Sequence, residues 1–144
     1  MHCPLNINLI IPFKDNKGER LNLYRIEIES YKEALASRVE DIKEEIIELF
    51  GNNFEMNIAA RSDGNTRKYY WRFKSSKRDR KYNRLNAESV VEYLTTIDDR
   101  RSLWLREVEE ELIYINANLK LIKGMLDSIG QCQKEQRELR EQKF

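Results

Sequence analysis

Residues 105–129, LREVEEELIYINANLKLIKGMLDSI, place one aliphatic residue at every third or fourth position. These aliphatic residues are Leu105, Val108, Leu112, Ile115, Leu119, Ile122, Leu126 and Ile129. Their steps alternate between three and four, which is the spacing of a heptad seam on one face of a helix. Because no proline follows Pro12, the backbone permits a long uninterrupted helix. The pattern predicts a helix over residues 100–141.

A second apolar stripe lies nearer the start of the chain. Its members are Ile28, Tyr31, Leu35, Val39, Ile42, Ile46 and Leu49. The spacing predicts a helix over residues 28–50, ended by Gly51, a residue common just past the last helical turn. Each stripe needs a partner, so we expect the two long helices to pack antiparallel within one chain in a coiled-coil-like arrangement. A homodimer, in which the seam joins two chains, is the alternative.

Residues 54–75 have the pattern of a β-hairpin. The tetrapeptide Ser62-Asp63-Gly64-Asn65 is a strong turn signal between two alternating runs. Side chains alternate between the faces of a strand, so Tyr69, Trp71 and Phe73 share one face of the return strand. A two-stranded hairpin is marginal alone, and we therefore expect this aromatic face to pack on a helix.

The remaining elements are shorter. Residues 5–28 form a strand and turn region, with a strand at 5–11, and residues 21–28 fit either a strand or the start of a helix. A short helix is expected over 86–97, capped by Asn86. The expected fold class is α+β, mostly α. We expect a single domain over residues 1–144, with the hairpin and short helix forming a head on two long antiparallel helices.

Charge is concentrated in the hairpin and the loop after it. The whole chain has a net charge of +1, yet residues 67–84 contain nine basic residues and one acidic residue. This segment therefore carries +8 and the rest of the chain −7. Clustered cations beside aromatic residues are typical of nucleic-acid backbone binding, in which Tyr70 or Tyr82 could stack on a base. The candidate nucleic-acid-binding residues are Arg67, Lys68, Tyr70, Arg72, Lys74, Lys77, Arg78, Arg80, Lys81, Tyr82 and Arg84.

Two other interpretations of this segment stay open, since an acidic protein surface or plain solvent could also face the basic loop. No helix-turn-helix, zinc-finger or ribonucleoprotein motif accompanies it, so the pattern does not choose between DNA and RNA.

The run Tyr69-Tyr70-Trp71-Arg72-Phe73, followed by a basic loop, Leu85 and long charged helices, resembles a group of small proteins of bacterial and archaeal mobile elements. The resemblance covers about residues 66–125 and implies an accessory protein of a mobile element or phage. No catalytic residues come with that group. The order helix, hairpin, helix is also similar to prefoldin-like chaperone subunits, but the expected N-terminal strand and the basic hairpin depart from that pattern.

The last helix carries further apolar residues outside its seam. Trp104, Tyr114, Leu121 and Met125 form a second stripe that is harder for one partner helix to cover, which indicates packing of the head there or dimerisation. The first three are the candidate interaction residues for an alternative function, a helical protein-interaction module that acts as an adaptor or as an inhibitor of a nucleic-acid enzyme.

No catalytic or metal-binding motif is found. The chain lacks a P-loop, a GxGxxG and a GxSxG motif, and its one histidine, His2, lies beside Cys3. With Cys132 distant, these residues cannot form a zinc site of the usual kind. The acidic run Glu109-Glu110-Glu111 is expected to be a solvated helix face. We therefore expect a non-enzyme without cofactor or metal.

The cellular location is inferred from the cysteines and the start of the chain. Two distant cysteines indicate free thiols in a reducing compartment. The first residues lack the basic and apolar regions of a signal peptide, and no apolar run is long enough to span a membrane. We expect a cytoplasmic protein that does not bind membranes.

Overall fold

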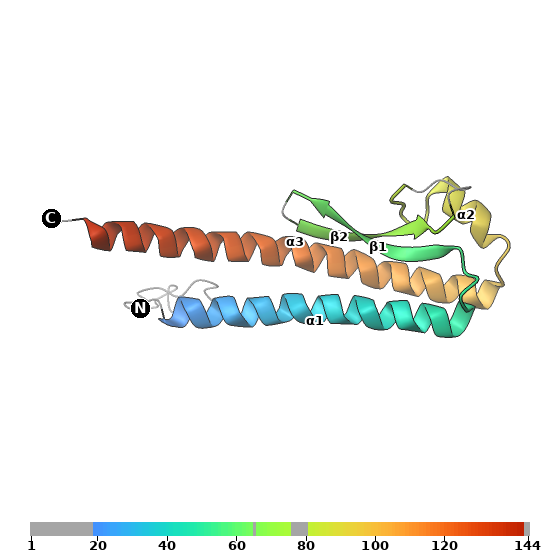
Figure 1. Cartoon of the computed structure of the whole chain (residues 1–144), viewed down its shortest axis with the longest axis horizontal. Helices are drawn as coiled ribbons and strands as arrows, with labels where there is room; N and C mark the ends of the chain where they lie inside the picture. The colour runs from blue at the N-terminus through green and yellow to red at the C-terminus, as the bar shows by residue number, and fades with distance from the viewer. Residues whose placement is uncertain (1–18, 65, 76–80, 143–144) are drawn as a thin grey trace, which may run out of the picture. The chain divides into compact units, whose positions relative to one another are not determined.

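A computed structural model describes residues 19–64, 66–75 and 81–142 of the chain. The elements follow in the order α1 (Glu19–Phe50), β1 (Met56–Asp63), β2 (Thr66–Phe73), α2 (Glu88–Leu94) and α3 (Asp99–Glu141) (Figure 1). This confirms the α+β, mostly α fold class. The strand predicted at 5–11 lies outside the described residues.

The chain divides into two compact units. The hairpin unit comprises Ala34–Lys120, and the helical unit comprises Met1–Glu33 with Leu121–Phe144. Helices α1 and α3 each contribute one half to either unit. Both β-strands, α2 and all predicted nucleic-acid-binding residues belong to the hairpin unit.

Helix α1 begins nine residues before its predicted start at residue 28, and residues 21–28 are helical. Leu21 and Ile28, seven residues apart, are buried, whereas Leu23 and Ile26 between them are exposed. The apolar residues of this segment therefore follow the helical period only in part, which explains why the sequence pattern did not distinguish a helix from a strand there. The helix ends as predicted, with Gly51 at a φ of 75° and its N–H donating to the Ile47 carbonyl at 2.8 Å.

The apolar stripe predicted for α1 is wrong at two positions. Val39, Ile42 and Ile46 are buried in the core, but the side chains of Tyr31 and Leu49 are 53% and 46% exposed. The Tyr31 hydroxyl donates to the Glu27 carboxylate at 2.7 Å, one helical turn away. The Tyr31 hydroxyl thus has a hydrogen-bond partner on the same helix while its side chain remains exposed.

Strands β1 and β2 pair antiparallel, from Met56 opposite Phe73 to Asp63 opposite Thr66. Gly64 occupies the turn with a φ of 67°, as the turn signal predicted. The inward face of β2 is buried as predicted, with Trp71 and Phe73 at most 1% exposed. The outer edge of β2 is covered by the chain that returns after the basic loop.

In the hairpin unit, α3 lies between α1 on one side and the hairpin with α2 on the other (Figure 1). Arg38 of α1 contacts Glu111 of α3, and Arg101 contacts the Leu49 carbonyl, so the two helices run antiparallel in this unit. The α3 residues in the core are Leu105, Val108, Leu112, Ile115 and Leu119. These seam residues are thus buried within one chain.

The helical unit continues the same seam. Ile122 and Ile129 are buried there, Leu126 is half-buried, and Arg25 of α1 donates to the side chain of Gln133 at 3.1 Å.

The cap predicted for the short helix is wrong. The N-cap of α2 is Ala87, which makes no side-chain capping bond, and the helix is shorter than the predicted 86–97. Its start is fixed instead by packing, because Val90 and Tyr93 are buried in the core. Helix α3 does have a side-chain cap, since the Asp98 carboxylate accepts the backbone N–H of Arg101 at 3.1 Å.

Candidate nucleic-acid interface

The outer face of the hairpin gathers basic and aromatic side chains from three segments. We define the outer hairpin face as Arg61, Lys68, Tyr70, Arg72, Tyr82 and Arg84. Alternation along β2 turns Lys68, Tyr70 and Arg72 away from the core, because their neighbours at the odd positions point into it. The strand register sets Arg61 of β1 opposite Lys68.

The segment after the basic loop brings Tyr82 and Arg84 to the same face. Asn83, between them, pairs with Trp71 through two backbone hydrogen bonds of 2.8 Å. This isolated bridge provides hydrogen-bond partners for the Trp71 N–H and C=O groups at the edge of β2 and holds the segment alongside the strand. Two tyrosines that are twelve positions apart in the sequence thereby become neighbours.

Each tyrosine of the outer hairpin face has two cations over its ring. Tyr70 and Tyr82 meet edge to face with their ring centroids 5.9 Å apart. The Lys68 Nζ and Arg84 Cζ atoms lie 5.3 and 5.8 Å from the Tyr70 centroid. The Arg72 and Arg61 Cζ atoms lie 5.0 and 5.6 Å from the Tyr82 centroid. All four distances are in the range of cation–π attraction, which orders the cations before any ligand arrives.

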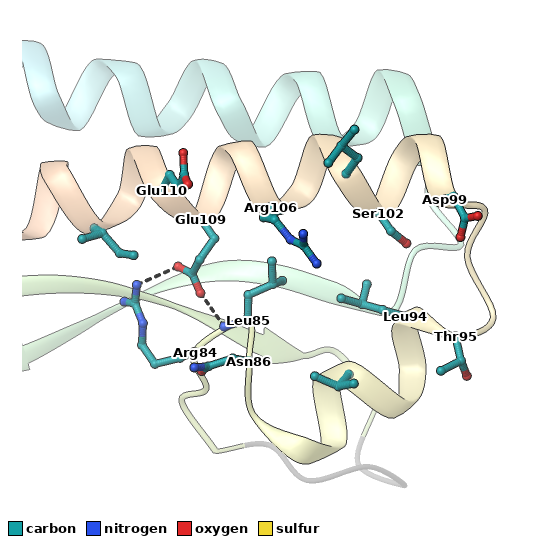
Figure 2. Close-up of a pocket in the computed structure, with 13 residues that line it drawn as sticks. Arg84, Leu85, Asn86, Leu94, Thr95, Asp99, Ser102, Arg106, Glu109 and Glu110 are labelled. Atoms are coloured by element: carbon teal, nitrogen blue, oxygen red, sulfur yellow. Dashed lines mark hydrogen bonds and ion pairs between the residues drawn. The ribbon is translucent and has the colours of Figure 1, made fainter.

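A buried carboxylate on α3 anchors one end of this face. Glu109 is 9% exposed. Its carboxylate accepts a hydrogen bond of 2.7 Å from the Arg84 guanidinium and another from the backbone N–H of Leu85 (Figure 2). Burial raises the pKa of the Glu109 carboxyl above its usual value, while the Leu85 N–H and the Arg84 charge oppose that rise. The expectation of a solvated acidic face is therefore wrong for Glu109, because its partners come from a distant segment.

A buried amide on α3 anchors the hairpin beside it. Asn116 accepts the backbone N–H of Tyr69 at 2.8 Å and donates to the Tyr69 carbonyl at 3.0 Å. One side chain thus pairs with both backbone groups of β2 at this position, as a neighbouring strand would. The outer hairpin face is consequently held on a fixed support.

Of the other predicted nucleic-acid-binding residues, Arg67, Lys74 and Lys81 are exposed. Lys77, Arg78 and Arg80 lie outside the described residues. Three residues of the site were not predicted. The position of Arg61 opposite Lys68 follows from the strand register, whereas the local sequence carries no signal for the supports Glu109 and Asn116.

The three predicted interaction residues have different surroundings. Trp104 is half-buried and packs against the core, with its ring centroid 6.1 Å from that of Phe50. Tyr114 and Leu121 are 71% and 65% exposed.

A groove of about 710 Å³, lined by both apolar and charged side chains, lies between α2 and α3 (Figure 2). Val91, Leu103 and Ile113 line it and are about half exposed.

In the part of the chain that the structure describes, no three His, Cys, Asp or Glu side chains are placed to share a metal ion, and Cys132 is a free, half-buried thiol. His2 and Cys3 lie outside that part. Within the described helices, none combines the length and the apolar character that crossing a bilayer requires.

Comparison with known proteins found no match, since no family model fits the chain and no curated protein or solved structure is similar to it.

Proposed function

We propose that this protein is a non-enzymatic nucleic-acid-binding protein that contacts a nucleic-acid strand through the outer hairpin face. The observation that carries the proposal is the pair of tyrosines, each with two cations over its ring. The resemblance of residues 66–125 to mobile-element proteins supports the further proposal that it serves such an element as an accessory protein.

The chemistry of the face suits a single-stranded ligand. Cations that neutralise phosphates release bound counterions, which favours association at low salt. Guanidinium planes and tyrosine rings stack on bases, but only on bases that are not already stacked in a duplex. Since the cations already lie over the tyrosine rings, a base that approaches meets ordered guanidinium groups as well as aromatic edges.

A titration by fluorescence anisotropy tests the proposal. Labelled single- and double-stranded DNA and RNA are titrated at about 50 and about 200 mM salt, where binding to phosphates changes most. The test variant is Arg61→Gln with Arg72→Gln, because these two cations lie over Tyr82, whereas Glu109 is paired with Arg84 and Leu85. The matched control is Lys134→Gln with Arg137→Gln, which removes the same charge from exposed positions of α3.

Tight binding of single strands that weakens with salt is the expected result for the wild type. The Arg61 and Arg72 variant should bind more weakly, with a slope of log affinity against log salt that is shallower by roughly 1.4, the value for two lost single-strand phosphate contacts. The control variant should retain the wild-type slope. Absence of binding to all four ligands at the lower salt would overturn the proposal. A separate variant with glutamine at Lys77, Arg78 and Arg80 tests the contribution predicted for the loop.

The α2–α3 groove favours a second candidate function, a protein-interaction module. Its half-exposed residues Val91, Leu103 and Ile113 form an apolar surface of a kind that marks binding sites for other proteins. Sedimentation velocity of the wild type and of Leu103→Ser over a wide concentration range checks self-association through this groove. A monomer at every concentration in both proteins would leave only a different protein as the partner.

A further inference from the structure

A cavity of about 480 Å³ lies between the start of β2 and helix α3. Four cations line it: Arg67 and Lys68 of β2, Arg84, and Lys120 of α3. All of its lining residues belong to the described part of the chain, and none of them is acidic. Its volume is in the range of small-ligand sites and exceeds the volume of a bare phosphate group. The lining therefore favours an anionic ligand about as large as one nucleotide.

The walls of this cavity are held in place by buried groups. Asn116, which lines the cavity and is 8% exposed, joins α3 to β2 through its two hydrogen bonds to Tyr69. Arg84 is held by Glu109 from behind at 2.7 Å. The Glu109 charge offsets one of the four cations, which leaves an excess of positive charge on the cavity. A site with a fixed wall loses little conformational entropy when a ligand enters.

Two of the cavity cations also belong to the outer hairpin face. Lys68 and Arg84 line the cavity and at the same time lie over the Tyr70 ring. A phosphate that contacts these two cations in the cavity would be joined through one sugar to a base within reach of Tyr70. The geometry thus continues the proposed strand-binding surface into a recess beside it.

A recess of this kind favours the terminal phosphate of a nucleic-acid strand over its internal phosphates. An internal phosphate has two ester bonds and one negative charge, and the strand must enter and leave the recess. A terminal phosphate has one ester bond and a charge near −1.5 to −2 at neutral pH, by analogy with phosphorylated side chains. The terminal group therefore gains more than an internal phosphate from an excess of cations.

We propose that this cavity binds the terminal phosphate of a nucleic-acid strand whose adjoining base contacts Tyr70. The proposal rests on the proposed nucleic-acid binding and adds a preference for phosphorylated strand ends. Both 5′- and 3′-phosphates offer the same monoester chemistry, and separate oligonucleotides distinguish them.

The test compares single-stranded oligonucleotides of one sequence with a 5′-phosphate, a 3′-phosphate or hydroxyl groups at both ends. Their affinities are measured by fluorescence anisotropy at one salt concentration, with the label attached at an internal base. The cavity variants are Lys120→Gln, which removes a cation that lies outside the outer hairpin face, and Ala117→Leu, which adds bulk to the cavity lining without a change in charge. Both positions are exposed on α3, and Lys134→Gln is the matched control on the same helix.

The wild type should bind one of the phosphorylated oligonucleotides about tenfold or more tightly than the hydroxyl form, the gain typical of hydrogen bonds to a charged group. Lys120→Gln and Ala117→Leu should lose most of this preference and keep their affinity for the hydroxyl form, and Lys134→Gln should keep both. Circular dichroism melting verifies that each variant is folded.

Two results would overturn the terminal-phosphate site and leave the proposed function intact. One is equal, salt-dependent binding of all three oligonucleotides by the wild type. The other is a preference for phosphate that both cavity variants retain in full. Failure of the wild type to bind any oligonucleotide would instead overturn the proposed function itself.

Discussion

At the scale of single residues, two polar side chains of α3 determine how the hairpin is attached. Glu109 and Asn116 are the buried polar residues of the described chain, and both pair with backbone groups of other segments. A buried backbone group left without a partner costs about 1–3 kcal/mol, so each of these side chains stabilises one position of the hairpin against α3. These hydrogen bonds fix the position of the hairpin along α3, which apolar contacts alone would not do.

The raised pKa of Glu109 predicts a specific dependence of stability on pH. In the interval between the usual carboxyl pKa and the raised one, the folded state binds more protons than the unfolded state. The contribution of Glu109 to the free energy of unfolding therefore falls as the pH rises through that interval. Glu109→Gln, which cannot ionise and still offers an oxygen to the Leu85 N–H, should gain stability relative to the wild type as the pH rises above the usual carboxyl pKa.

Urea denaturation of both proteins at several pH values measures this difference, because the other carboxyl groups are the same in both and cancel. Glu110→Gln, at the exposed neighbouring position, shows the effect of removing one carboxylate from the same helical turn. A difference between wild type and Glu109→Gln that stays constant or grows in favour of the wild type as the pH rises would contradict the assignment.

At the scale of elements, the hairpin depends on one backbone conformation in its turn. Gly64 has a φ of 67°, and a Cβ atom added there would meet no atom within 4 Å. Gly124, in the middle of α3, has equally open surroundings but lies in a regular helix. The two glycines thus differ in backbone conformation and not in available space.

Alanine at these two positions should have opposite effects. Gly64→Ala should lower the free energy of unfolding by about 1–2 kcal/mol, the cost of the left-handed conformation for an L-residue. Gly124→Ala should raise it by about 0.5–1 kcal/mol, because alanine loses less conformational freedom in a helix. Thermal and urea unfolding of both variants measure the two changes, and destabilisation by Gly124→Ala would show that its surroundings are more crowded than described.

At the scale of the whole molecule, the two units bury apolar residues to different extents. The core of the hairpin unit combines side chains from its helices and from the hairpin, including Trp71, Phe73, Val90 and Leu105. The buried apolar residues of the helical unit, among those described, are Leu21, Ile28, Ile122 and Ile129. Regions with fewer buried contacts open at a lower free energy than the main core.

Hydrogen exchange should therefore divide α3 into two parts. We expect the backbone amides of residues 121–141 to exchange faster than those of residues 103–120, although both belong to one continuous helix. Helix α1 offers an internal comparison, with faster exchange expected before Ala34 than after it. Exchange measured by mass spectrometry on peptides from each half decides the matter, and uniform protection along α3 would contradict the prediction.

The sequence by itself determined the elements and the faces they bury. The three-and-four spacing in residues 105–129, the turn at Gly64 and the alternation of Tyr69, Trp71 and Phe73 are all properties of neighbouring residues, and the structure agrees with each. It failed where a local pattern was ambiguous, as in residues 21–28, or where a residue found a partner nearby, as Tyr31 did.

Only the tertiary structure decided which charges lie together. Arg84 and Glu109 are 25 positions apart, and Tyr69 and Asn116 are 47 apart. Such pairs leave no trace in a local pattern, because helix and strand periods report only which face a residue occupies and not which segment meets that face. The basic block was therefore visible in the sequence, whereas its tyrosine partners, its buried supports and the cavity beside Lys120 followed from packing the hairpin against α3.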